Sequence, residues 1–260
     1  MSRDDDRVAT VQDLAAAGGE TGRDVRASGE TRLELLGTWR LTDDLDRVVL
    51  PANARRLIAL LALAGARSRA YVAGCLWPES AEALALGNLR ATVSRLKRSR
   101  PGVLLVEPGT LALAPSVNVD VHHLHRVADD VLHGDGDVPP GALPVLADAE
   151  LLPGWYDDFV LLHRERLEQL RLHALEALAD RLCAQGDYPE AVAAALAAIQ
   201  AEPLRESAHR TLMRVHLAEG NPAAALRQFR SFRDRVRREI GMEPSPRMLA
   251  LVPARVASAR

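Results

Sequence analysis

A run of basic side chains without acidic neighbours is the part of this sequence best suited to bind another molecule. Between residues 83 and 106 there is no Asp or Glu, although the whole chain carries a formal net charge of -2. The cations of this stretch are Arg90, Arg95, Lys97, Arg98 and Arg100. A guanidinium group donates two parallel hydrogen bonds to O6 and N7 of guanine, and each of these cations can pair with phosphate. The local charge therefore favours binding to nucleic acid.

A single helix over residues 81–98 would place most of these cations on one face. Leu89, Val93 and Leu96 recur at helical spacing and would point inward. At about 100° per residue, the opposite face carries the polar and cationic side chains. The apolar face of such a helix packs against the rest of the domain, and the opposite face carries side chains that can reach base edges in the major groove. We therefore predict a DNA contact set of Arg90, Ser94, Arg95, Lys97, Arg98, Arg100 and Thr110, in which Lys97 and Arg100 touch phosphate.

Short strands are expected on both sides of this helix. Residues 32–37 and 47–50 cluster apolar residues around a polar turn at 42–44, which predicts two antiparallel strands. Residues 103–107 and 111–114 flank a Pro-Gly-Thr turn and predict a hairpin. Thr110 would stand at the tip of this hairpin, next to DNA backbone or the minor groove.

Two shorter helices are expected before the basic one. Asn53 is predicted to cap the first, which Gly65 closes. Ser68 is predicted to cap the second, which ends at Pro78, and Ser80 to cap the third. Strands, three helices and a closing hairpin, in that order, describe a winged helix-turn-helix over residues 31–116.

From Val119 onward the pattern is wholly helical. The Gly-Asp pair at 186–187 falls on the Gly-Asn pair at 220–221, and Leu178 falls on Leu212, at the spacing of about 34 residues that is typical of tetratricopeptide repeats. The fold class expected is therefore mainly α, a winged helix-turn-helix followed by an all-α tetratricopeptide-like domain over 117–250. Residues 1–30 read as a disordered tail and 251–260 as a C-terminal tail.

No enzyme motif or cofactor site accompanies these elements. Lys97 is the chain's only lysine and precedes an arginine, so the sequence has no phosphate-binding loop ending in Gly-Lys-Ser or Gly-Lys-Thr. No Gly-x-Ser-x-Gly elbow occurs either. His122, His123 and His125 fit no zinc-ligand spacing and are expected on the surface. We predict no enzymatic activity, no cofactor and no metal.

The compartment expected is the bacterial cytoplasm, in association with the nucleoid. The chain has no apolar run long enough for a membrane helix and no basic-then-apolar leader at its start. Cys75 and Cys183 fall in different predicted modules, and we interpret them as buried thiols in a reducing compartment. No membrane partner is expected.

Several motifs resemble one known family. They are Leu-Trp-Pro-Glu at 76–79, the basic helix at 88–98, Leu-Leu-Pro-Gly-Trp-Tyr-Asp-Asp at 151–158, Arg-Glu-Arg-Leu at 164–167, Glu-Pro-Leu-Arg-Glu at 202–206, Leu-Met at 212–213 and Glu-Ile-Gly-Met-Glu-Pro-Ser-Pro at 239–246. Together they resemble the Streptomyces antibiotic regulatory protein (SARP/AfsR-type) family over residues 31–250. The resemblance implies an OmpR-like DNA-binding domain, a bacterial transcriptional activation domain, and activation from direct repeats near a promoter. Its implied partners are double-stranded DNA, RNA polymerase holoenzyme and a second copy of the chain on DNA.

Two other interpretations remain open at this point. The chain could be a tetratricopeptide-type interaction adaptor with a degenerate winged helix, or a repressor that acts by occupying a promoter. A second basic group on a late helix is more typical of a solvated or partner-facing surface than of DNA binding. Its members are Arg227, Arg230, Arg233, Arg235, Arg237 and Arg238.

Overall fold

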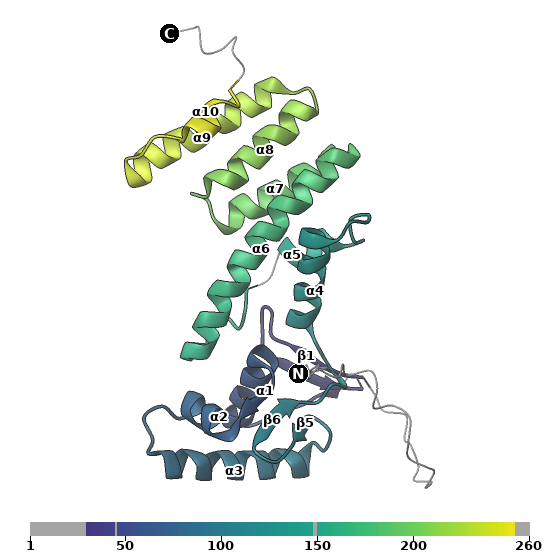
Figure 1. Ribbon diagram of the computed structural model, residues 1–260, viewed down its shortest axis with the longest axis vertical. Helices are drawn as coiled ribbons and strands as arrows, with labels where there is room; N and C mark the ends of the chain where they lie inside the picture. The colour runs from purple at the N-terminus through teal and green to yellow at the C-terminus, as the bar shows by residue number, and fades with distance from the viewer. Residues whose placement is uncertain (1–29, 45, 148–149, 253–260) are drawn as a thin grey trace, which may run out of the picture.

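The computed structural model describes residues 30–44, 46–147 and 150–252. The described chain is elongated, with strands and short helices at one end and a stack of longer helices at the other (Figure 1). The tails predicted at 1–30 and 251–260 fall almost wholly outside the described residues. Among the described helices, none combines the length and apolar character that a membrane crossing requires.

The first sheet has a register that the sequence pattern did not predict. Its order is β3-β2-β1-β7, with β1 at Thr31–Glu34, β2 at Arg40–Asp43, β3 at Asp46–Arg47 and β7 at Val117–Val119. The second strand predicted at 47–50 was wrong except at Arg47, which belongs to β3. The chain turns earlier, at Gly37 with φ +74°, so that Leu41 pairs with Leu33 and both side chains are buried. β7 then pairs in parallel with β1.

Three helices follow, and their caps only partly match expectation. They are α1 at Ala52–Ala64, α2 at Arg69–Leu76 and α3 at Glu82–Ser99. The Ser68 cap is confirmed, because its hydroxyl accepts the Tyr71 N–H at 3.2 Å, and Gly65 closes α1 as predicted. The caps predicted at Asn53 and Ser80 were wrong. Pro51 and Ala81 occupy the N-cap positions instead, and neither makes a side-chain hydrogen bond. At α1, proline already holds the φ angle that suits the start of a helix. At α3, the helix starts after Ala81, so Ser80 lies one residue too early to cap it.

The wing is confirmed, with one additional strand. β5 at Leu104–Val106 and β6 at Thr110–Leu113 form the predicted hairpin. β4 at Arg67–Ser68 pairs with β6 in the order β4-β6-β5. The start of α2 is thereby attached to the wing next to its turn, where Ser68 pairs with Thr110.

The remaining chain forms antiparallel helix pairs, as the repeat pattern predicted. The helices are α4 at Asp120–His133, α5 at Ala142–Ala147, α6 at Asp158–Gln185, α7 at Tyr188–Ala201, α8 at Glu206–Ala218, α9 at Pro222–Ile240 and α10 at Pro246–Leu249. The matched joints fold alike, since Asp187 and Asn221 each cap the next helix with their own side chain. The expected fold class is confirmed. The short α10 was not predicted.

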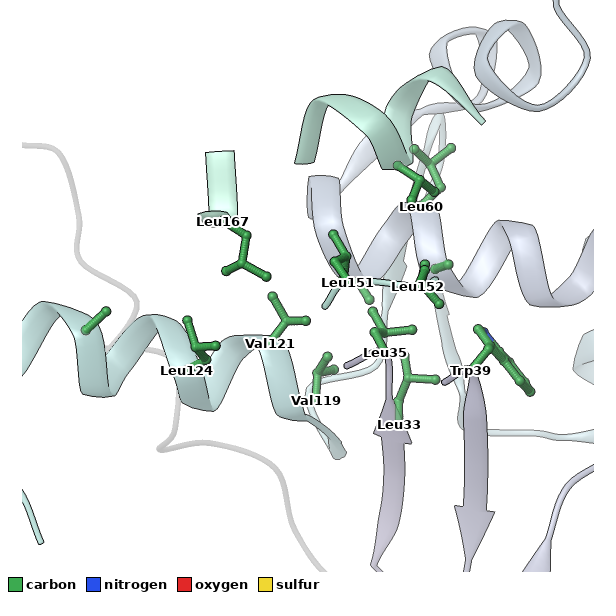
Figure 2. Close-up of a cluster of buried hydrophobic side chains, with 14 of the residues drawn as sticks. Leu33, Leu35, Trp39, Leu60, Val119, Val121, Leu124, Leu151, Leu152 and Leu167 are labelled. Carbon is green, nitrogen blue, oxygen red and sulfur yellow. The ribbon is translucent and has the colours of Figure 1, made fainter. Parts of the chain in front are cut away.

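One hydrophobic core joins the two halves of the molecule. Figure 2 shows leucines that come from β1 and the residue after it, from α1, from α4 and from the loop before α6, all within one cluster. The labelled members are Leu33, Leu35, Trp39, Leu60, Val119, Val121, Leu124, Leu151, Leu152 and Leu167. A separate cluster beneath α8, α9 and α10 is built around Met213, Phe229, Phe232, Val236 and Met248. The winged domain and the first helices of the second half are therefore packed as a unit.

Candidate nucleic-acid interface

The inner face of α3 is fixed to the winged domain by apolar packing. Leu89, Val93 and Leu96 are buried as the sequence predicted, and Ala85 is buried with them. Thr92 is also buried, and its hydroxyl donates to the Asn88 carbonyl oxygen at 2.9 Å. The buried hydroxyl thus has its hydrogen-bond partner within the helix, as buried polar groups require.

The outer face of α3 presents the predicted cations to solvent. Arg90, Arg95, Lys97 and Arg98 are all exposed, and Ser94 lies exposed among them. In the described part of the chain, none of these four cations has a carboxylate within ion-pair distance. α3 also lies along the edge of the molecule farthest from α8, α9 and α10 (Figure 1). A duplex could approach this face without meeting the helical half.

Arg100 and Thr110, also predicted as contacts, are placed differently. Arg100 follows the last residue of α3, and its Nη1 lies 3.3 Å from Oδ2 of Asp43 in β2. Thr110 begins β6, and its hydroxyl donates to Oε2 of Glu107 at 3.3 Å. Each side chain is held by a carboxylate of the protein, which competes with phosphate. We therefore expect both to contribute less to DNA binding than the face of α3.

Two cations that the sequence reasoning did not select lie beside the wing. Arg67 and Arg69 flank the cap residue Ser68, and the pairing of β4 with β6 places them along the hairpin. The Arg69 N–H donates to the Gly109 carbonyl oxygen at 3.1 Å, and the Arg67 guanidinium lies 5.6 Å from the centre of the Tyr71 ring. The only signal for them in the sequence was a basic pair around a helix cap. Their position depends on a strand pair that links residues far apart in the chain.

The second basic group, on α9, is largely neutralised within the protein. Arg237 lies 2.6 Å from an oxygen of Glu243, and Arg233 lies 2.7 Å from an oxygen of Asp234. Arg235 and Arg238 both approach Glu239. Arg227 and Arg230 are exposed and have no carboxylate within ion-pair distance in the described chain. The basic group of α9 is therefore mostly paired, whereas all four cations on the outer face of α3 are unpaired.

The loop before α6 connects the helical half to the first sheet. The Gly37 N–H donates to the Glu150 carbonyl oxygen at 2.7 Å, and the Leu152 N–H donates to the Leu35 carbonyl oxygen at 2.8 Å. Arg164 of α6 holds the same loop, with its guanidinium donating to the carbonyl oxygens of Leu151, Leu152 and Trp155. These contacts fix the helical half against the domain that carries α3.

Charged and polar side chains reinforce the same junction. Arg56 of α1 donates from Nε to Oδ1 of Asp157, just before α6, at 2.8 Å. His122 of α4 places its Nε2 2.7 Å from the carbonyl oxygen of Ala62 in α1. Neither contact was predicted, because both join positions that are distant in sequence.

Asp120, at the start of α4, ends the β1 strand with a set of backbone hydrogen bonds. Its Oδ2 accepts the N–H groups of Leu35 at 2.8 Å and Leu36 at 2.9 Å, and its Oδ1 accepts the Val121 N–H at 2.7 Å. Burial is the largest influence on this carboxyl and raises its pKa, against the lowering effect of the three backbone donors. Asp120 therefore connects the end of β1 to the start of α4 through these hydrogen bonds.

Replacing Asp120 by alanine should destabilise the protein by about 1–3 kcal/mol, because partly buried N–H groups lose their acceptor. Urea denaturation would measure the change. Asp129 makes the matched control, since it is exposed on the same helix and, among the described residues, its carboxylate pairs with His133 alone. An Asp120→Ala protein as stable as Asp129→Ala would show that solvent replaces the carboxylate without cost.

The histidines and cysteines form no site of their own. Within residues 30–44, 46–147 and 150–252, no group of three or more His, Cys, Asp or Glu side chains could hold a metal ion. Cys75 and Cys183 are free thiols and are partly exposed, so the expectation that both are buried was wrong. Both lie on helix faces that the neighbouring helices only partly cover.

Comparisons with known proteins agree with this architecture. Residues 144–254 match the model of the bacterial transcriptional activator domain. The regulatory protein AfsR of Streptomyces coelicolor is 32% identical over 84% of this chain, which spans 23% of the length of AfsR. Among solved structures, Mycobacterium tuberculosis EmbR in complex with a low-affinity phosphopeptide shares the fold, with a TM-score of 0.65 at 20% identity over 86% of this chain and 64% of EmbR. The chain belongs to the Streptomyces antibiotic regulatory protein (SARP/AfsR-type) family, with an OmpR-like winged helix-turn-helix and a bacterial transcriptional activator domain.

Proposed function

We propose that this protein is a sequence-specific DNA-binding activator of transcription that inserts α3 into the major groove. The observation that carries the proposal is the outward face of α3, where Arg90, Arg95, Lys97 and Arg98 are exposed and have no carboxylate partner in the described chain. Unpaired cations on a rigid helix can replace the counterions of a duplex, and arginines can read guanine. Ser94, Arg95 and Arg98 are the proposed base contacts.

The helical half is the proposed contact for RNA polymerase. The division proposed is a DNA-binding unit over 31–116 and an activator unit over 117–250, which the shared core holds in a fixed relative position. Two copies would bind direct repeats near a promoter and associate on the DNA. Because α7, α8 and α9 lie away from α3 (Figure 1), their surface stays available while α3 is bound to DNA. Activity of this kind would place the protein at the nucleoid.

Gel retardation with DNA from upstream of the neighbouring genes, including the protein's own promoter, tests the proposal. We expect retention of at least one fragment in the presence of excess competitor DNA. Failure to retain any fragment would favour the interaction adaptor instead. Reporter transcription from the retained promoter then decides between activation and repression.

Lys97→Ala should weaken binding to all sequences alike and should reduce the salt dependence. Each phosphate contact contributes about 0.9 to the slope of log Kobs against log salt, so the slope should fall by about one. Titrations at several salt concentrations, with operator and with unrelated DNA, would measure it. A loss confined to the operator would mean that Lys97 reads a base and not the backbone.

A further inference from the structure

The outer face of α3 has an apolar part as well as a cationic part. Leu84 lies in the first turn of α3, and the residue is 61% exposed. At about 100° per residue, Leu84 falls between the directions of Ala91 and Arg95, on the face proposed for DNA. A large apolar side chain left in water on a helix costs free energy that the fold does not recover. Leu84 is therefore available to contact a partner outside the chain.

Gly87 lies near the middle of the same face, one turn after Leu84. Glycine is among the least favourable residues in a helix interior, because it fixes a very flexible backbone and buries nothing. A Cβ atom built at Gly87 would meet no other atom within 4 Å, so packing inside the protein does not require glycine here. The missing side chain leaves the backbone of α3 open to close approach at this point.

We propose that Leu84 and Gly87 read an A·T pair, with the thymine methyl group against Leu84 and the base edge close to the backbone at Gly87. The proposal rests on the DNA-binding function proposed above and adds a base preference to it. Apolar side chains recognise thymine through its C5-methyl group in the major groove, and arginines recognise guanine. DNA is the occupant that fits, because the apolar part is continuous with unpaired cations and residues 83–106 contain no acidic side chain. Each half-site should thus combine a thymine near the start of α3 with guanine near Arg95 and Arg98.

Deoxyuridine scanning of the protected operator provides the direct test, because it removes only the methyl group from each thymine. With the wild-type protein, one position per half-site should lose about fourfold in affinity, the value of one buried methyl group. With Leu84→Ala the same substitution should have no further effect. A flat scan, or an equal loss for both proteins, would overturn the inference while leaving the DNA-binding function intact. Absence of operator binding by the wild-type protein would instead refute the function itself.

The Gly87→Leu variant distinguishes an effect on the close approach of DNA to α3 from an effect on the stability of the helix. The variant should melt at a higher temperature than wild type, since leucine is a better helix former than glycine. It should nevertheless bind the operator at least about tenfold more weakly, because the new side chain blocks the approach of the base edge. Gly74→Leu is the matched control, because Gly74 also lies inside a helix, α2, with no atom within 4 Å of a Cβ, but off the proposed face. It should keep the wild-type affinity. Equal affinities for Gly87→Leu and wild type would contradict the proposal.

Discussion

Replacing both Arg95 and Arg98 by alanine should lower affinity for the operator by about 30-fold or more, because each bidentate contact to guanine contributes roughly 1–3 kcal/mol of discrimination. The fold should not change, since both side chains are exposed and neither contacts a carboxylate of the described chain. Affinity for unrelated DNA should fall much less, because base contacts and not only phosphate contacts are lost. Fluorescence anisotropy with operator and scrambled duplexes, at one fixed salt concentration, would measure both losses.

The control for this prediction is the double variant Arg227→Ala and Arg230→Ala on α9. It removes the same charge from two other exposed arginines without an ion pair to a described carboxylate. These residues lie on the half of the molecule remote from α3 (Figure 1). We expect operator affinity close to wild type. If the α9 variant lost as much affinity as the α3 variant, the protein would bind DNA through general charge or through a second site.

Leu35→Ala should lower the free energy of unfolding by about 2–5 kcal/mol, the range found when a buried leucine is cut to alanine. Leu35 is fully buried and lies between the first sheet, α4 and the loop before α6 (Figure 2). Since the core is shared, the helical half should lose stability together with the winged domain. The far-ultraviolet circular dichroism signal, which the long helices dominate, should therefore shift to lower urea along with tryptophan fluorescence.

Leu162→Ala serves as the comparison for the core, because Leu162 lies on α6 and is 47% exposed. Surface substitutions of this kind change stability by about 0.5 kcal/mol or less. A Leu35→Ala protein whose circular dichroism midpoint equals that of wild type would mean that the two halves unfold independently. The position of α3 would then not depend on the helical half.

Local patterns were enough to predict the elements that carry the proposed site. The inward set of Leu89, Val93 and Leu96 repeats at helical spacing, so the sequence specifies both the helix and its outward face. The wing follows from a Pro-Gly turn between apolar runs, and the repeats follow from small residues and caps at matching positions. Each of these signals acts within a few residues or within one repeat.

Apart from the helix caps predicted at Asn53 and Ser80, the errors and omissions concern contacts between distant positions. β2 forms at Arg40–Asp43 because β1 provides a partner in the right register, although residues 42–44 resemble a turn when read alone. Arg100 meets Asp43, and Asp120 meets Leu35, through the tertiary fold. Contacts between residues that are far apart in the chain leave no periodic pattern in a single sequence. Whether a cation is free or neutralised is therefore visible only in the structure, which shows that Arg233, Arg235, Arg237 and Arg238 of α9 are paired and that the cations on the outer face of α3 are not.

Photo-crosslinking from the centre of the α3 face tests the central claim most directly. The photoreactive residue p-azidophenylalanine would be placed at position 94 in one protein and at position 230 in another, both exposed helix positions. We predict that position 94 crosslinks to bases within the operator and that position 230 does not crosslink to it. Crosslinking from position 230 but not from 94 would contradict the assignment of α3 as the helix that reads DNA.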